Sequence, residues 1–84
     1  MIRVLFFASL REALGTAEIA VPWQAGLELP AGLIAAIARQ QGEAAAAILA
    51  DEQVICAHNQ RVCKHPTALN AGDEVAFYPP VTGG

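Results

Sequence analysis

The chain has 84 residues, of which 55% are hydrophobic and 15% are charged, and its formal net charge is −3 at pH 7. This length allows one small domain with a modest core, and the apolar composition excludes an intrinsically disordered chain. The shortage of basic residues argues against a nucleic-acid-binding protein. So small a domain leaves little room for a complete active site, and we expect part of its apolar surface to serve a partner.

The cellular setting follows from hydropathy and cysteine content. No apolar run reaches the roughly 18 residues that a membrane-spanning helix needs, so we expect no association with a membrane. The apolar start of the chain is soon followed by Arg11 and Glu12, so we expect no signal peptide. The two cysteines then predict a cytoplasmic protein whose thiols are reduced.

The first elements are a strand and a short helix. Residues 2–7 are rich in β-branched and aromatic side chains and predict a strand. We expect a helix over 10–14, with Ser9 as its N-cap and Glu12 as the capping-box partner of that serine. Gly15 is a typical helix stop.

A second strand and two helices follow. Residues 16–21 predict a strand that pairs with the first one. Pro30 and Gly42 suit the start and the stop of a main helix over 31–41. Its apolar face is expected to consist of Leu33, Ile34, Ile37 and Ala38. The alanine-rich residues 43–50 predict a second, lightly packed helix.

The last third of the chain predicts three strands. These cover residues 53–58, 61–63 and 74–78, with a turn at Asn59–Gln60 and a loop over 64–72. The order is β-α-β-α-α-β-β-β, which is an α+β pattern. It fits the β-grasp (ubiquitin-like) architecture, with a mixed five-stranded sheet and one main helix packed across it.

Strand alternation separates the two faces of this sheet. Arg3 and Glu74 mark the outward face, because charged side chains avoid a core. The inward face then holds Ile2, Val4, Phe6, Val75 and Phe77. The outward face also holds four apolar residues, which are Leu5, Phe7, Ala76 and Tyr78. This concentration on adjacent strands favours a surface that a partner covers.

The sequence closes on a separate segment. We expect a domain over 1–78 and an extended tail over 79–84, which reads Pro-Pro-Val-Thr-Gly-Gly. Its two glycines lack a Cβ, so the tail can enter a narrow channel. A free carboxylate at its end suits acyl chemistry with ATP. Because the chain has no phosphate-binding glycine motif, a partner has to bind the ATP, and we expect no cofactor on the chain itself.

In six segments the sequence resembles the MoaD family of ubiquitin-like sulfur carriers, the small subunits of molybdopterin synthase. The segments are Met1–Ala8, Arg11–Glu12, Gly15–Thr16, Asn59–Gln60, Gly72–Phe77 and Pro79–Gly84. Two positions depart from the family pattern. His58 stands where an aliphatic residue is usual, which affects the packing of that strand end, and Tyr78 stands where phenylalanine is common.

The resemblance implies a sulfur-donating subunit rather than a self-sufficient enzyme. A MoeB-like, E1-like adenylyltransferase would adenylate the carboxylate of Gly84, and sulfur transfer would convert it to a thiocarboxylate. The tail, with Pro80, Val81, Thr82 and Gly83, would enter the large subunit of a heterotetrameric synthase. There Gly84 would donate sulfur to cyclic pyranopterin monophosphate and build the dithiolene of the molybdenum cofactor.

The resemblance also implies a partner-binding surface. It places Phe7, Val62 and Tyr78 on the face that meets the partner, and strand alternation reaches two of these residues independently. Arg11 is either a further partner contact or a solvated helix charge.

Three other functions share these features. The first is a sulfur carrier for thiamine or for tRNA thiolation, against which the Phe-Phe-Ala start and the Pro-Pro-Val-Thr-Gly-Gly end argue. The second is a protein modifier that forms isopeptide bonds with lysines, since its tail chemistry is the same. The third is an interaction domain with an inert tail.

One group of residues falls outside these functions. Cys56, His58, Cys63 and His65 form a C-x-H-x4-C-x-H pattern. A two-residue turn pairs position 56 with 63 and 58 with 61, so all four side chains would share one hairpin face. A zinc site and a cross-strand disulfide are both conceivable. The unusual spacing and the reducing cytoplasm favour ordinary buried thiols and histidines instead, so we predict no metal site.

Overall fold

A computed structural model of the chain describes residues 1–27, 31–64 and 68–80. Within these ranges it contains five strands and three helices. The strands are β1 (Ile2–Phe6), β2 (Glu18–Val21), β3 (Ile55–His58), β4 (Arg61–Cys63) and β5 (Glu74–Tyr78). The helices are α1 (Ser9–Leu14), α2 (Gly32–Gln41) and α3 (Glu43–Leu49).

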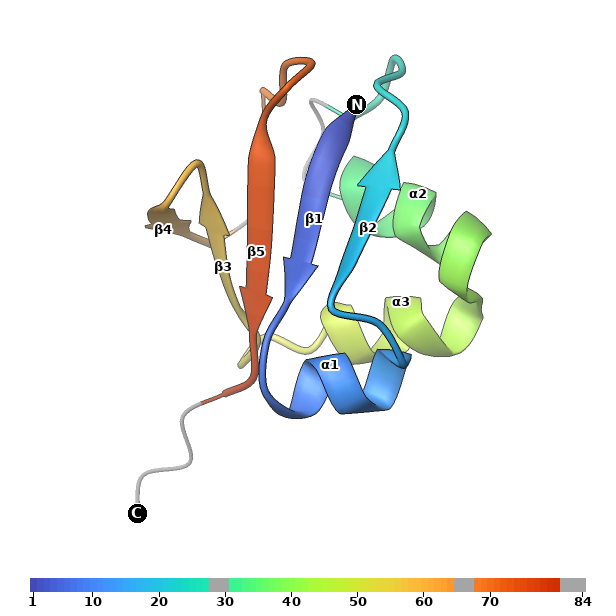
Figure 1. Cartoon of the computed structure of the whole chain (residues 1–84), viewed down its shortest axis with the longest axis vertical. Coiled ribbons are helices and arrows are strands. Elements are labelled where there is room, and N and C mark those ends of the chain that lie inside the picture. The colour runs from blue at the N-terminus through green and yellow to red at the C-terminus, as the bar shows by residue number, and fades with distance from the viewer. Residues whose placement is uncertain (28–30, 65–67, 81–84) are drawn as a thin grey trace.

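The five strands form one mixed sheet in the order β2-β1-β5-β3-β4 (Figure 1). The first and last strands, β1 and β5, are parallel, and all the other neighbours are antiparallel. This confirms the predicted α+β, β-grasp arrangement. Because β1 and β5 run in the same direction, their carboxyl ends lie next to each other at the same end of the sheet.

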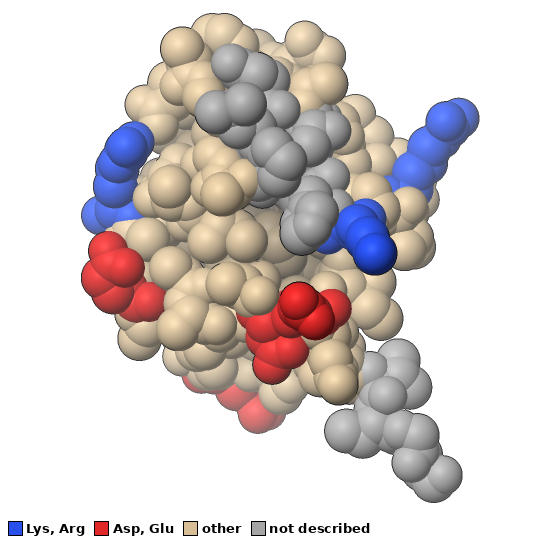
Figure 2. Space-filling view, turned by 180° about the vertical axis from the view of Figure 1, so that it is seen from behind, with Lys and Arg blue, Asp and Glu red and all other residues tan. Residues whose placement is uncertain are grey.

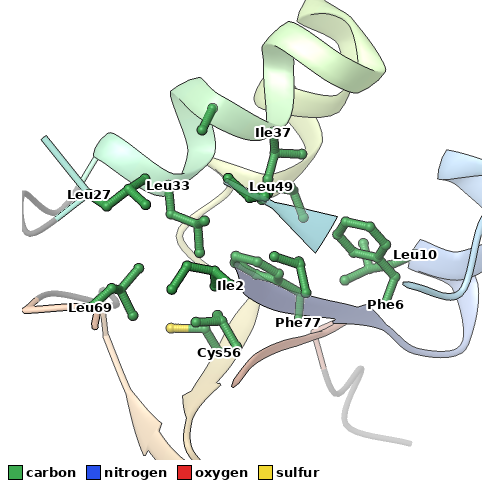
Figure 3. Close-up of a cluster of buried hydrophobic side chains, with 14 residues drawn as sticks. Ile2, Phe6, Leu10, Leu27, Leu33, Ile37, Leu49, Cys56, Leu69 and Phe77 are labelled. Carbon is green, nitrogen blue, oxygen red and sulfur yellow. The ribbon is translucent and has the colours of Figure 1, made fainter. Parts of the chain in front are cut away.

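Helices α2 and α3 lie on one side of the sheet, and the core fills the space between these helices and the sheet (Figures 1 and 3). The five residues predicted for the inward sheet face are all at most 2% exposed. Of the predicted face of α2, Leu33 and Ile37 are fully buried, while Ile34 only packs against the core. The core cluster is Ile2, Val4, Phe6, Leu10, Val21, Leu27, Leu33, Ala36, Ile37, Leu49, Cys56, Leu69, Val75 and Phe77.

The predicted cap of the first helix is wrong. Ser9 is already a helical residue, and Ala8 is the N-cap, with φ 52° and no side-chain capping bond. The Glu12 amide donates to the carbonyl of Ala8, so the capping box with Ser9 is absent. The reason is the sharp exit from β1, where Leu10 N–H already bonds to Phe7 O. The predicted stop at Gly15 is confirmed, with φ 72°.

Two strands begin later than predicted, because a side chain closes a turn before each of them. Thr16 Oγ1 accepts from the Glu18 amide and donates to the Glu18 carbonyl, so β2 begins at Glu18 rather than at residue 16. Asp51 Oδ1 accepts from the Gln53 amide at 2.9 Å, and β3 begins only at Ile55.

The helices are short. The longest in the described ranges, α2, has 10 residues. None of the helices found there has both the length and the apolar character that crossing a membrane requires.

Candidate functional site

A row of five residues in register crosses the outward face of the sheet from edge to edge. In sheet order it consists of Glu18, Leu5, Ala76, Ala57 and Val62. Four of the five are apolar. At one end of the row Val62 is 78% exposed, so an apolar side chain on edge strand β4 faces solvent. The predicted partner residue Val62 therefore belongs to the same face as the residues found by strand alternation.

The middle of this row differs from the prediction. Ala76 was expected to be exposed or covered by a partner, yet it is 4% exposed within the chain itself. It lies on β5, which has neighbours on both sides, and the flanking strands β1 and β3 shield its short methyl group. Leu5 is half-buried. On the outward face of the sheet, the large exposed apolar side chains are thus Val62 and, at the sheet end, Phe7 and Tyr78.

Phe7 and Tyr78 form an aromatic pair at that sheet end. Their ring centroids are 4.7 Å apart and the rings are nearly parallel, at 5°. Phe7 N–H donates to Phe77 O at 3.1 Å, which extends the β1–β5 pairing by one residue. Each of the two residues is 38% exposed. Exposed aromatic side chains held in place in this way are typical anchors of protein interfaces.

The tail leaves the domain at this aromatic pair. Strand β5 ends at Tyr78, and Pro79 and Pro80 follow it half-buried. Figure 1 shows the chain leaving the lower end of β5, at the sheet edge where α1 lies. The remaining predicted tail residues, Val81, Thr82, Gly83 and Gly84, are outside the described residues. The base of the tail and the predicted partner surface therefore meet at one place.

Arg11 lies on α1, the helix that directly follows β1. Its side chain is exposed. Because β1 and β5 end at the same edge of the sheet, α1 begins close to the point where the tail leaves. The position suits the partner contact that the resemblance implies.

A charged cluster lies at the opposite end of the outward face. Arg3 on β1 bonds to Glu18 on β2 at 3.1 Å and to Glu74 on β5 at 3.2 Å. The hydrogen bonds that Arg3 donates to the Glu18 carboxylate, and then the negative charge of Glu18, raise the pKa of the Arg3 guanidinium. The charge of Arg3 is thus balanced within the sheet. On the face seen from behind, lysine and arginine side chains lie apart from one another (Figure 2).

His58 has a partner at the end of β3. Its Nε2 lies 2.8 Å from Asp73 Oδ2, and because an ionised carboxylate only accepts, Nε2 carries the proton. The same oxygen accepts from the Asn70 amide at 2.9 Å. The Asn70 amide, and then His58, lower the pKa of Asp73. The residue that departs from the family pattern therefore fastens the β3 end to the loop before β5.

Cys56 and Cys63 are register partners, as the two-residue turn predicted. Their sulfur atoms are 3.2 Å apart, and Cys56 Sγ donates to the Cys63 carbonyl at 2.9 Å. Burial of Cys56, and then its hydrogen bond with Cys63, raise the pKa of the Cys56 thiol to about 12.

The four-residue cysteine and histidine pattern is not assembled as one group in the described part of the chain. His58 bonds to Asp73, and His65 lies outside the described residues. Among residues 1–27, 31–64 and 68–80, no three His, Cys, Asp or Glu side chains gather in a way that could hold a metal ion.

Comparison with known proteins identifies the family. The ThiS family matches residues 4–84. The molybdopterin synthase sulfur carrier subunit of Escherichia coli is 41% identical over 86 residues, covering 100% of both chains. That of Haemophilus influenzae is 36% identical over 84 residues, again covering 100% of both.

A solved structure shows the same fold. The crystal structure of SAMP1, the small archaeal modifier protein 1 of Haloferax volcanii, superposes with a TM-score of 0.79. The superposition covers 99% of this chain and 98% of that one at 24% identity. A similarity at this identity shows a shared fold and nothing about function. With a family match over nearly all residues and full-length relatives above 30% identity, this chain belongs to the ThiS family of ubiquitin-like proteins.

Proposed function

We propose that this chain is the sulfur carrier subunit of a molybdopterin synthase and that it carries sulfur as a thiocarboxylate at Gly84. The observation that carries the proposal is the full-length similarity to two molybdopterin synthase sulfur carrier subunits, which extends through the Thr-Gly-Gly that closes the sequence. These relatives are named as subunits, so the proposal includes a large subunit as partner.

The chemistry takes place on the carboxylate of Gly84. One carboxylate oxygen attacks the α-phosphate of ATP on an E1-like, MoeB-like adenylyltransferase, and pyrophosphate leaves. A sulfur nucleophile then displaces AMP and leaves a thiocarboxylate. At the large subunit the sulfur passes to cyclic pyranopterin monophosphate, and water restores the carboxylate. The chain supplies the acyl group, and its partners bind the ATP and the pterin.

The geometry of the domain supports this division of work. The aromatic pair Phe7–Tyr78 lies at the base of the tail, and Val62 lies on the same outward face. One partner can therefore hold the domain by this face while the tail reaches its active site. Covalent geometry limits a six-residue segment to about 20 Å, so the reacting group of the partner has to lie within that distance of the docked Tyr78.

The test is the intact mass of the chain after incubation with the adenylyltransferase, ATP and a sulfur source. We expect one oxygen to be replaced by sulfur at the C-terminal carboxylate. A variant lacking Gly84 and one with a single alanine appended after Gly84 serve as matched controls, and both should stay unmodified while keeping the circular dichroism of the wild type. An unchanged wild-type mass, with active partner enzymes, contradicts the proposal.

A second step separates this function from its alternatives. The thiocarboxylated chain, mixed with the large subunit and cyclic pyranopterin monophosphate, should form molybdopterin. Formation of lysine conjugates instead would indicate a protein modifier, and sulfur delivery only to a thiazole precursor or to tRNA would indicate a carrier of another pathway.

A further inference from the structure

The hairpin β3–β4 brings two free thiols together. Asn59 and Gln60, with φ 50° and 70°, form the two-residue turn, and this turn sets Cys56 opposite Cys63. Both cysteines are free, and their sulfur atoms lie 3.2 Å apart. Neither thiol has a part in the tail chemistry described above.

We propose that Cys56 and Cys63 form a redox-active dithiol, which small-molecule disulfides such as oxidised glutathione convert to a reversible disulfide across the β3–β4 hairpin. This inference does not depend on the proposed sulfur carrier function.

The strand register brings the two residues close to the separation that the bond requires. Residues directly opposite one another in an antiparallel pair have Cβ atoms about 4.5–5.5 Å apart, and disulfides need about 3.5–4.5 Å. The two sulfur atoms must approach by about 1 Å to reach the bond length of about 2.0 Å. Strand β4 can supply this movement, because it is three residues long and pairs with β3 alone.

The surroundings of the two thiols give them different roles. Cys63 is half-buried, and Cys56 is 3% exposed at the edge of the core cluster (Figure 3). Cys56 also lines a cavity of about 320 Å³, together with Leu49, Val54 and Lys64. Cys56 is thus shielded from a small disulfide in solution, and burial also raises the pKa of its thiol. Cys63 is therefore the thiol that attacks first.

The exchange proceeds in two displacements. The Cys63 thiolate attacks one sulfur of the small disulfide, and a small thiolate leaves. Cys56 then loses its proton and attacks the Cys63 sulfur of the mixed disulfide, which releases a second small thiolate. The two protons of the cysteines end on the released thiols. Two protein thiols are oxidised, and one small disulfide is reduced to two thiols.

The product would tie the edge strand covalently to the sheet. Val62 lies between the turn and Cys63 on β4, so the disulfide would hold this exposed apolar residue against β3. In a reducing cytoplasm the pair stays in the dithiol form, and it closes when the pool of small disulfides rises.

The test treats the reduced full-length chain with excess oxidised glutathione and measures intact mass. We expect the main product to lack two hydrogen atoms and to carry no glutathione, with a peptide map that joins Cys56 to Cys63. The Cys56→Ser variant keeps the attacking thiol and should stop at one glutathione adduct on Cys63. The Cys63→Ser variant should react at least tenfold more slowly.

A wild-type chain that collects stable glutathione adducts, links to a second copy or stays fully reduced would overturn the inference. If a serine variant does not fold, the peptide map of the wild type still decides. The unfolding temperature gives an independent readout, because closing the loop should raise the midpoint by roughly 5–15 °C. A variant with serine at both positions should not respond to the oxidant. A wild-type midpoint that falls on oxidation would show that the bond does not fit the native hairpin.

Discussion

Phe7 and Tyr78 stack with ring centroids 4.7 Å apart, although 70 residues separate them along the chain. Their contact exists because β1 and β5 are parallel neighbours that end at the same edge of the sheet. The pair lies where the tail begins, and each of the two residues is 38% exposed. A partner that receives the tail would meet these two rings first.

Replacement of either ring should weaken partner binding more than it weakens the fold. We expect Phe7→Ala and Tyr78→Ala each to lower the affinity for the large subunit by about 2 kcal/mol, as for central aromatic anchors. The loss of stability should be about 1 kcal/mol, because the rings are only partly buried. Titration calorimetry and urea unfolding measure the two effects. Tyr78→Phe is the matched control and should keep both properties, and a large stability loss with unchanged affinity would contradict the docking role.

Val62 should affect binding without affecting the fold. Because its side chain is 78% exposed on the edge strand, Val62→Asp should change the free energy of unfolding by about 0.5 kcal/mol or less. The new charge should lower the affinity for the large subunit at least tenfold. The Val62→Thr variant, of similar shape and without the charge, separates charge from packing. If Val62→Asp binds the large subunit with the affinity of the wild type, β4 is not part of the interface.

Asp73 should make the stability of the fold depend on acidic pH. Its pKa is lowered by the Asn70 amide first and by His58 second, so its contribution is complete above the unfolded value of about 3.9. This contribution is lost as the pH falls through the lower folded value. Urea unfolding from pH 7 to pH 2 should show Asp73→Asn less stable by about 1 kcal/mol at neutral pH. The two proteins should converge at the acid end.

The control variant for this prediction follows from the order of the two groups that lower the pKa of Asp73, the Asn70 amide first and His58 second. His58→Gln keeps the Asn70 contact, so it should retain most of the acid dependence of the wild type. If His58→Gln abolishes that dependence, the histidine and not the Asn70 amide holds the carboxylate in its ionised form.

Gly32 should resist replacement although it lies in a helix. A Cβ at this position would collide with the Gly26 carbonyl oxygen, which is backbone and cannot move aside as a flexible side chain would. We expect Gly32→Ala to destabilise the fold by about 1–3 kcal/mol, against the gain of about 1 kcal/mol that helix propensity alone would give.

The control for this prediction is Ala35→Gly in the exposed part of the same helix. It should cost about 1 kcal/mol through propensity, so that both directions of the exchange destabilise the protein. Thermal unfolding of the two variants checks the signs, and a stabilised Gly32→Ala variant would show that the loop around Gly26 yields.

Local patterns were enough for much of the architecture. Alternation in β1 and β5 identified the inward residues, since a strand has only two faces. The turn at Asn59–Gln60 set the register of Cys56 with Cys63, because a two-residue hairpin leaves no other pairing. Six segments of the sequence, of which the closing Pro-Pro-Val-Thr-Gly-Gly is the most specific, indicated the family.

Contacts between distant segments needed the tertiary structure. Ala76 looked exposed by alternation, and only its place between β1 and β3 shows that it is buried. His58 looked like a misfit at a strand end, and its partner Asp73 lies 15 residues further along. The periodicity of apolar residues indicates which side of a strand or helix faces the core, but it does not indicate which other element lies beside it. The sequence by itself therefore determined most of the elements and their inward faces, and it predicts the chemistry of the tail. The parallel pairing of β1 with β5, a long-range choice, alone decided that Phe7, Tyr78 and the tail meet at one edge of the sheet.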